Sequence, residues 1–315
     1  MKEQFKIDVA HGLAQKPKSL PSKYFYDKTG DALFVKIMNM PEYYPTKAEY
    51  EIFKYKSQEM LLSMGLKPDS FFELIELGAG DGTKTKELLR VLLDGEFDFE
   101  YLPIDISSSS LDHLESSLSQ EFPSLKVKLK HGDYFNVLET LRENHHPKVI
   151  LFLGSNIGNL TDEMSAKFIY QIGSNLKPGD HLILGVDLIK SEKLVIPAYD
   201  DPQGITRDFN LNLLSRMNNE LGGNFDLSTF EHEAEYTSDE GIARSFLVSR
   251  IAQEIPIESI GKSFLFEKGE RIQTEISRKY NDEILKRILE KTDFKIVNKL
   301  TDSREYFADY VLHRI

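Results

Sequence analysis

The stretch that decides the fold is Glu76-Leu77-Gly78-Ala79-Gly80-Asp81-Gly82-Thr83-Lys84, which lies between an expected strand at residues 72–77 and an expected helix at residues 83–93. Glycines at alternate positions permit a tight turn and let a ligand approach the backbone closely. The spacing is not the Gly-x-Gly-x-x-Gly of dinucleotide-binding proteins, and Asp81 would repel a pyrophosphate at the helix N-terminus. The turn therefore favours a nucleoside ligand without phosphates over a nicotinamide dinucleotide. A tight turn that binds nothing is the plainer alternative.

Further acids follow the next two expected strands. Asp105 ends an expected strand at residues 100–106, where a carboxylate can accept hydrogen bonds from both hydroxyls of a ribose. On its own, Asp105 would more simply cap the helix expected at residues 108–120. Asp133 and Tyr134 follow the third strand, where a carboxylate can accept from an adenine amino group and a ring can cover the base. With the glycine turn, this arrangement resembles the layout of a class I S-adenosylmethionine-dependent methyltransferase.

Strand and helix patterns alternate along two parts of the chain, which predicts βαβ units and a parallel sheet. The other strands of this kind are expected at residues 126–131, 149–153, 181–186, 294–300 and 306–312, and the other helices at residues 162–175 and 282–291.

The N-terminal segment and the region from residue 190 to residue 280 have a different pattern. Prolines divide the first into short helices, and alternating stretches in the second are typical of antiparallel strands. The expected helices lie at residues 31–38, from about Thr46 onward and at residues 208–220, and the expected strands at residues 243–251 and 263–266.

These patterns predict an α/β protein with two domains. The first is a class I (Rossmann-like) methyltransferase domain at residues 55–189, completed by residues 281–315. The second is an α+β substrate-binding domain that combines residues 1–54 with residues 190–280. We expect the active site between the two domains.

The composition excludes several kinds of chemistry. The 315 residues include no Cys, which removes disulfides, thiolate nucleophiles and iron–sulfur clusters. The eight His residues are scattered without metal-ligand spacing, so no metal is expected. The 39 basic and 51 acidic residues give a net charge of −12, which argues against nucleic-acid binding. No secretory signal or membrane span is predicted, so we expect a cytoplasmic protein without a membrane partner, and we expect a monomer.

The loop Gly154-Ser155-Asn156-Ile157-Gly158-Asn159 bears on the identity of the methyl acceptor. Methyltransferases that act on the amino groups of nucleobases usually carry an Asn/Asp-Pro-Pro-aromatic motif here, and this chain has no Pro-Pro pair. The loop instead offers amide donors and acceptors at the catalytic edge of the sheet. With the acidic charge, this disfavours a DNA or RNA acceptor.

Six segments occur in the order found in one known family. They are Tyr24-Phe25-Tyr26-Asp27, Pro41-Glu42-Tyr43-Tyr44-Pro45-Thr46, Glu76-Leu77-Gly78-Ala79-Gly80, Gly154-Ser155-Asn156-Ile157-Gly158-Asn159, Ala198-Tyr199-Asp200-Asp201 and Thr274-Glu275-Ile276-Ser277. From about residue 20 to its end, the chain resembles the histidine-specific Nα-methyltransferases of ergothioneine biosynthesis. The second and last segments are the most specific. The resemblance implies S-adenosylmethionine-dependent methylation of the α-amino group of L-histidine, up to trimethylhistidine (hercynine).

The resemblance also implies which residues act on the amine and the cofactor. Tyr43, Asn159 and Tyr26 would be catalytic, with Tyr43 hydrogen-bonded to the reacting amine. Aromatic rings in this region would suit the growing N-methyl cations through cation–π contacts. The cofactor-binding residues would be Tyr26, Phe34, Gly78, Lys84, Asp105, Asp133 and Tyr134.

The same resemblance implies an amino-acid pocket. Its residues would be Tyr43, Asn159, Tyr199, Glu275, Ser277, Gly154, Thr206 and Ser245. Asn159 and Tyr199 would hold the α-carboxylate or the amino group. Glu275 and Ser277 would face the imidazole, and residues two apart do share one face of a strand. Without the resemblance, Glu275 would more simply be a surface strand residue.

Ser245 departs from the family, whose members have Met at this position. A smaller polar side chain would widen or rewet the pocket near the imidazole. One alternative is therefore an N-methyltransferase for another amino acid, such as a tryptophan derivative, although an indole has only one N–H donor for Glu275 and Ser277. The other alternative is a non-catalytic S-adenosylmethionine-binding protein.

Overall fold

The computed structural model describes residues 2–142 and 144–315, which form two compact units. Unit 1 comprises Met1–Tyr44 and Ile189–Lys279, and unit 2 comprises Pro45–Leu188 and Tyr280–Ile315. The first boundary therefore falls before Pro45 and not after residue 54 as predicted. The reason is helix α3 (Pro45–Met64), which packs along its length on the sheet and on helix α4 of unit 2.

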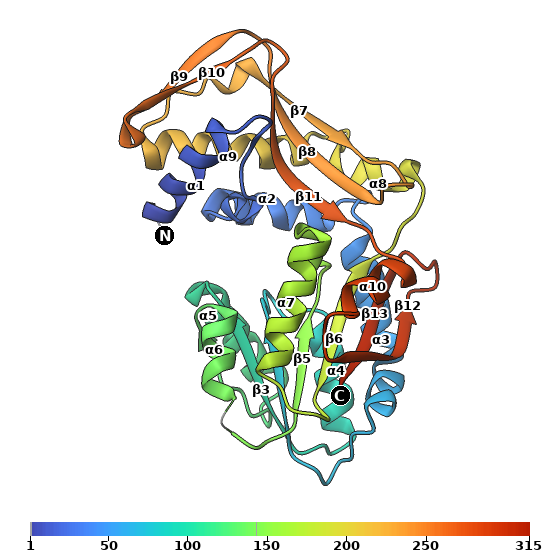
Figure 1. Ribbon diagram of the computed structural model, residues 1–315. Helices are drawn as coiled ribbons and strands as arrows, with labels where there is room; N and C mark the ends of the chain where they lie inside the picture. Colours follow the sequence, from blue (N-terminus) through green and yellow to red (C-terminus); the bar gives the residue numbers. More distant parts are fainter. Residues whose placement is uncertain (1, 143) are drawn as a thin grey trace. The chain divides into compact units, whose positions relative to one another are not determined.

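Unit 2 contains a seven-stranded sheet with the strand order β12-β13-β6-β5-β2-β3-β4 (Figure 1). Its strands are β2 (Phe72–Leu77), β3 (Phe99–Asp105), β4 (Lys130–His131), β5 (Lys148–Phe152), β6 (His181–Asp187), β12 (Phe294–Thr301) and β13 (Phe307–Arg314). Strands β2 to β6 are parallel, whereas β13 is antiparallel to both of its neighbours. The connection from β12 to β13 spans only residues 302–306, which is too short for a parallel crossover.

The predicted strand at residues 126–131 is the one in this sheet that is much shorter than expected. Only Lys130–His131 pairs as β4, and Val127 adds an isolated bridge to Tyr101. An edge strand has a partner on one side only, so fewer hydrogen bonds hold it in register.

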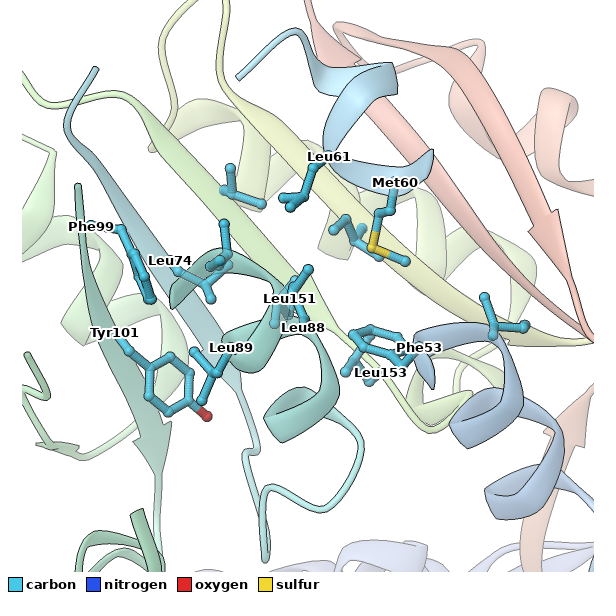
Figure 2. Packing of buried hydrophobic residues seen from close by; sticks show 14 of the residues in the cluster. Phe53, Met60, Leu61, Leu74, Leu88, Leu89, Phe99, Tyr101, Leu151 and Leu153 are labelled. Atoms are coloured by element: carbon cyan, nitrogen blue, oxygen red, sulfur yellow. The ribbon is translucent and has the colours of Figure 1, made fainter. Parts of the chain in front are cut away.

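Helices cover both faces of the unit 2 sheet. Besides α3 they are α4 (Thr85–Asp94), α5 (Ser108–Glu121), α6 (Tyr134–Leu141), α7 (Asp162–Ser174) and α10 (Asp282–Leu289). Figure 2 shows Phe53 and Met60 of α3 and Leu88 of α4 packed against strand residues such as Leu74 and Leu151. Strands β2, β5 and β6 are buried along their whole length, which explains the apolar runs of β5 and β6, whereas β2 also buries two glutamates, Glu73 and Glu76.

The strand order gives the sheet a reversal point at β2. From β2 the chain runs outward through β3 and β4, and then returns to β5 and β6 on the other side of β2. In open α/β sheets, ligands bind beyond the carboxyl ends of the strands at such a point. We call the segments that follow these ends, residues 78–84, 105, 133–134 and 154–159, the carboxyl edge.

Unit 1 combines helices with a four-stranded sheet of order β1-β11-β8-β7 and a ribbon of β9 and β10 (Figure 1). The helices are α1 (Lys2–Ala14), α2 (Lys28–Asn39), α8 (Glu192–Tyr199) and α9 (Ile205–Leu221). The strands are β1 (Lys18–Ser19), β7 (Phe230–Glu235), β8 (Ile242–Ser249), β9 (Gln253–Ile257), β10 (Lys262–Phe266) and β11 (Arg271–Arg278). Buried side chains of α1, α2 and α9 share one apolar core with these strands.

Candidate active site

The glycine turn of unit 2 depends on glycine at specific positions. Gly78, Gly80 and Gly82 have φ angles of +74°, +56° and +67°, in the left-handed region that other residues rarely adopt. A Cβ atom on Gly78 would lie 2.6 Å from the hydroxyl oxygen of Tyr134, and one on Gly82 would lie 2.6 Å from a methyl group of Leu114. The turn is therefore a close-packed backbone cradle that has no room for side chains at these two positions.

Glu76, at the end of β2, stabilises this turn through hydrogen bonds inside the protein. Its carboxylate is buried and accepts hydrogen bonds from the hydroxyls of Thr85 at 2.8 Å and Tyr101 at 2.5 Å. Burial raises the pKa of Glu76 to about 7. Both oxygens are used inside the protein, so Glu76 holds β2 to the start of α4 and does not face a ligand.

Asp105 and Asp133 each use one carboxylate oxygen for the backbone. Oδ1 of Asp105 accepts from the amide of Ser107 at 2.9 Å, and Oδ1 of Asp133 accepts from the amides of Phe135 and Asn136 at 3.0 and 3.3 Å. Within the described residues, neither Oδ2 makes a hydrogen bond. Asp133 is thus fixed as the cap of α6 and Asp105 in the turn before α5, each with one acceptor oxygen left over, which fits the predicted contacts to ribose and adenine.

Tyr134 lies at the start of α6, above the glycine turn. It is half-buried, and its ring packs edge-on against Phe152 with 6.5 Å between centroids. Burial, together with the negative charges of Asp105 and Asp133, raises the pKa of Tyr134 to about 12. The chemistry and placement of Gly78, Asp105, Asp133 and Tyr134 fit a nucleoside.

Lys84 forms an ion pair with Glu49, a fully buried residue of α3. The Glu49 carboxylate also accepts the amide N–H of Gly154, at 2.8 and 3.0 Å from its two oxygens. Glu49 therefore holds the end of the glycine turn beside the loop that follows β5. The buried Asp309 carboxyl is near enough to Glu49 and Lys84 to feel their charges. Burial together with the Glu49 charge raises the pKa of Asp309 well above the usual range.

The loop after β5 has an unusual backbone. Gly154 and Ser155 have φ angles of +74° and +57°, and a short 3-10 helix (Asn156–Asn159) follows them. The Ser155 hydroxyl accepts the amide N–H of Asp187 at 2.9 Å, which offsets the strain. Asn159, at the end of this helix, is half-buried.

In unit 1, the predicted imidazole contacts lie on two paired strands. Glu275 of β11 pairs with Ser245 of β8, and Ser277 pairs with Ala243. The side chains of Glu275, Ser277 and Ser245 therefore lie on one face of the sheet. The Ser245 hydroxyl donates to Oε2 of Glu275 at 3.2 Å. Burial raises the pKa of Glu275, while Lys279 and Ser245 lower it.

Ser245 is fully buried, and its hydrogen bond supports the Glu275 carboxylate. The effect of this smaller side chain on the pocket stays a prediction.

Lys279 contacts two of the predicted site residues and was not itself predicted. Its side chain is 1% exposed, and its ammonium donates to the Tyr199 hydroxyl at 2.6 Å and to the Ser277 hydroxyl at 2.8 Å. The period-two pattern of Glu275 and Ser277 continues to residue 279 and would have indicated it. We call Tyr199, Ser245, Glu275, Ser277 and Lys279 together the Glu275 face.

A group of aromatic rings in unit 1 contains three predicted site residues. The Phe34 ring lies edge-on to Tyr26 and to Tyr43, with centroids 5.5 and 6.3 Å apart. Phe209 of α9, which sequence analysis did not select, completes the group at 6.0 Å from Phe34. Tyr26 is 43% exposed, so the group is open on one side.

Thr206 lies in the first turn of α9 and is buried. The Asp201 carboxylate accepts the backbone N–H groups of Ile205 at 3.0 Å and Thr206 at 2.7 Å. The Tyr199-Asp200-Asp201 segment therefore supplies the cap that begins α9 and fixes Thr206.

The predicted residues thus form separate sets. Unit 2 brings together Gly78, Lys84, Asp105, Asp133, Tyr134, Gly154 and Asn159. Unit 1 brings together Tyr26, Phe34 and Tyr43 in the aromatic group, and Tyr199, Ser245, Glu275 and Ser277 on the Glu275 face, with Thr206 on α9.

A family model described as histidine-specific, S-adenosylmethionine-dependent methyltransferase matches residues 5–314. The chain belongs to this family. A histidine N-alpha-methyltransferase of Mycolicibacterium smegmatis is 37% identical over 281 residues, which cover 89% of this chain and 86% of that protein. One from Mycobacterium tuberculosis is 36% identical, with coverage of 87% and 83%. Ergothioneine biosynthesis protein 1 of Schizosaccharomyces pombe is 32% identical and matches 93% of this chain but 38% of its own length.

Membership of the histidine-specific methyltransferase family agrees with the order of the unit 2 strands. The protein has a class I, Rossmann-like fold, and S-adenosylmethionine is its cofactor. Within residues 2–142 and 144–315, no helix is long and apolar enough to cross a membrane.

Proposed function

We propose that this protein transfers methyl groups from S-adenosylmethionine to the α-amino group of L-histidine, up to trimethylhistidine. The observation that carries this proposal is the Glu275 face. A carboxylate and a hydroxyl lie two residues apart on one side of β11, and imidazole has two ring nitrogens to bind them.

Residues of the carboxyl edge would hold the cofactor. Asp105 would accept the ribose hydroxyls, Asp133 the adenine amino group, and the Tyr134 ring would cover the base. Gly78 would let the backbone approach the ligand, as its positive φ and close contact with Tyr134 require glycine. When bound, S-adenosylmethionine would supply an electrophilic methyl group on a sulfonium, from which a neutral thioether departs as a good leaving group.

The protein's main task is then to orient the amino acid and keep its amine neutral. Glu275 and Ser277 would bind the imidazole, and Tyr199 with Asn159 would bind the α-carboxylate or the amino group. Tyr43 would accept or donate a hydrogen bond at the amine. None of these residues needs to form a covalent bond with the substrate.

The aromatic group would suit repeated methylation. Each added methyl group makes the nitrogen larger and more apolar, and the final product is a permanent cation. The faces of Tyr26, Phe34 and Tyr43 would stabilise such a cation by about 0.5–2 kcal/mol per contact. A carboxylate in their place would favour the protonated amine, which cannot react.

The test is an amino-acid panel incubated with the protein and S-adenosylmethionine, read by product mass. We expect L-histidine to gain one, two and then three methyl groups. If only another amino acid, such as a tryptophan derivative, gains methyl groups, that amino acid and not histidine is the substrate. Cofactor binding without turnover on any amine would indicate a non-catalytic protein. The cytoplasmic location and monomeric state remain predictions from the sequence.

A further inference from the structure

Lys279 occupies a position that its chemistry does not explain by itself. Lysine side chains are rarely fully buried, and the Lys279 side chain is only 1% exposed. Its backbone N–H donates to the carbonyl of Gly241 at 2.7 Å, which fixes the residue directly after β11. The ammonium lies 4.7 Å from the centroid of the Tyr199 ring.

The hydrogen bonds of Lys279 have a fixed direction. An ammonium has only donors, so the oxygens of Tyr199 and Ser277 must accept from it, at 2.6 and 2.8 Å. The proton of each hydroxyl is then directed away from Lys279. Tyr199 and Ser277 are both presented as donors.

Tyr199 is also held through its backbone. His232 Nε2 donates to the Tyr199 carbonyl at 2.8 Å, since a carbonyl oxygen can only accept. With its carbonyl bound by β7 and its hydroxyl bound by Lys279, the Tyr199 ring has little freedom to turn.

We infer that Lys279 is a positioning residue that makes the Glu275 face select the neutral form of the substrate imidazole in a single tautomer. This inference rests on the proposed function. Glu275 accepts the ring N–H, and Ser277, whose proton Lys279 directs outward, donates to the unprotonated ring nitrogen. An imidazolium has no such nitrogen and would place a second cation near the ammonium.

The charge of Lys279 also acts on Glu275. Burial raises the pKa of that carboxyl, and the Lys279 charge acts in the opposite direction, so the ammonium favours the ionised acceptor. Lys279 thereby acts on both residues that would bind the imidazole: it orients the Ser277 hydroxyl as a donor and favours Glu275 as an ionised acceptor.

The direct test uses the unaltered protein with L-histidine labelled with ¹⁵N in the ring and with S-adenosylhomocysteine, which cannot react. At about pH 6, free histidine is mainly imidazolium because its ring pKa is about 6.5. We expect the bound ring to show one protonated and one unprotonated nitrogen. A bound imidazolium would overturn the inference, and this result does not depend on any variant folding.

Variants then identify the residue responsible. We expect Lys279→Met to raise the KM for histidine about tenfold or more, to leave kcat within about twofold and to lose the preference for the neutral ring. Lys279→Arg keeps the charge and the donors and should retain that preference. Affinity for S-adenosylmethionine should not change in either variant.

Lys18→Met is the matched control, because Lys18 is also a buried lysine of unit 1 and pairs with Glu270. It should lower stability without changing the KM or the state of the bound ring. Unchanged KM and ring state in Lys279→Met, or the same change in both variants, would overturn the inference. Absence of histidine methylation by the unaltered protein is a separate result, which contradicts the proposed function and removes the inference with it.

Discussion

Two glutamates, the buried Glu76 in unit 2 and the half-buried Glu275 in unit 1, show how differently the two regions are built. Burial raises the pKa of both. Both carboxylate oxygens of Glu76 accept hydrogen bonds, from Thr85 and Tyr101, whereas Glu275 accepts one hydrogen bond, from Ser245 to Oε2. Among the described residues, Oε1 of Glu275 has no hydrogen-bond partner. Glu76 therefore serves the fold, and Glu275 is left with an acceptor for a ligand.

The same contrast extends to the surrounding residues. The carboxyl edge consists of backbone turns and caps that lie within a few residues of their strands. The Glu275 face consists of side chains from α8, β8, β11 and the residue after β11, and these segments are far apart in the sequence. Changes at the carboxyl edge should thus affect stability and cofactor binding, and changes on the Glu275 face should affect histidine binding.

The largest effect is expected for Gly78→Ala. The positive φ costs an alanine about 1–2 kcal/mol, and displacing the Tyr134 hydroxyl adds about 1–3 kcal/mol, so the native turn loses about 2–5 kcal/mol of stability. Calorimetric titration should show no measurable S-adenosylmethionine binding. Gly65→Ala is the control, because Gly65 has a similar φ of +66° but no atom within 4 Å of the added Cβ. Equal cofactor affinity in the two variants would show that the cradle does not bind the cofactor.

The next effect concerns the titration of Glu76. Its pKa rises from 4.5 in the unfolded chain to about 7 in the folded protein. The folded state therefore binds more protons between these values, and the stability that Glu76 contributes below about pH 4.5 is lost as the pH rises through about 7. The loss amounts to about 3 kcal/mol at most.

Glu76→Gln cannot titrate and should not show this loss. Urea unfolding of both proteins at about pH 4.5 and about pH 8 should show the wild type losing stability relative to the variant. A difference between the two proteins that is independent of pH would mean that Glu76 titrates normally, and would weaken the contrast with Glu275.

Much of the carboxyl edge was predictable because its signals are local. Gly78 and Asp105 lie directly beside the strands that place them, and the apolar runs of β2 and β5 define those strands. The direction of β13 was not predictable from its own sequence, since it depends on the short connection after β12. The length of β4 depends on its position at the sheet's end.

The Glu275 face was only partly predictable. Glu275 and Ser277 followed from a family resemblance and from period two, whereas Lys279 lies beyond the motif that carries the resemblance. The hydrogen bond from Ser245 depends on the pairing of β8 with β11, and that register shifts at an irregularity between Gln273 and Glu275. Such a shift is set by tertiary packing, because the buried Thr274 hydroxyl donates to Asn210 on α9.

Glu275→Ala should weaken histidine binding by about 2 kcal/mol, or roughly 30-fold in KM, because it removes a charged acceptor. Affinity for S-adenosylmethionine should stay the same, and both can be measured on one preparation. Glu240→Ala is the control, since Glu240 pairs with Arg244 at the surface of the same unit. Equal losses of histidine and cofactor affinity would argue against a direct contact with the imidazole.

Ser245→Ala should have the smallest effect. Loss of one hydrogen bond to Oε2 of Glu275 costs about 1 kcal/mol, or roughly fivefold in the KM for histidine. The variant also removes a contact that lowers the pKa of Glu275, so that pKa rises. Because Glu275 must be ionised to accept the ring N–H, the acid limb of kcat/KM should move to higher pH. Ser249→Ala, at a buried serine of the same strand that donates to the Ile251 carbonyl, should leave the profile in place. If both variants shift the acid limb equally, the effect comes from packing of β8 and not from the support that Ser245 gives to Glu275.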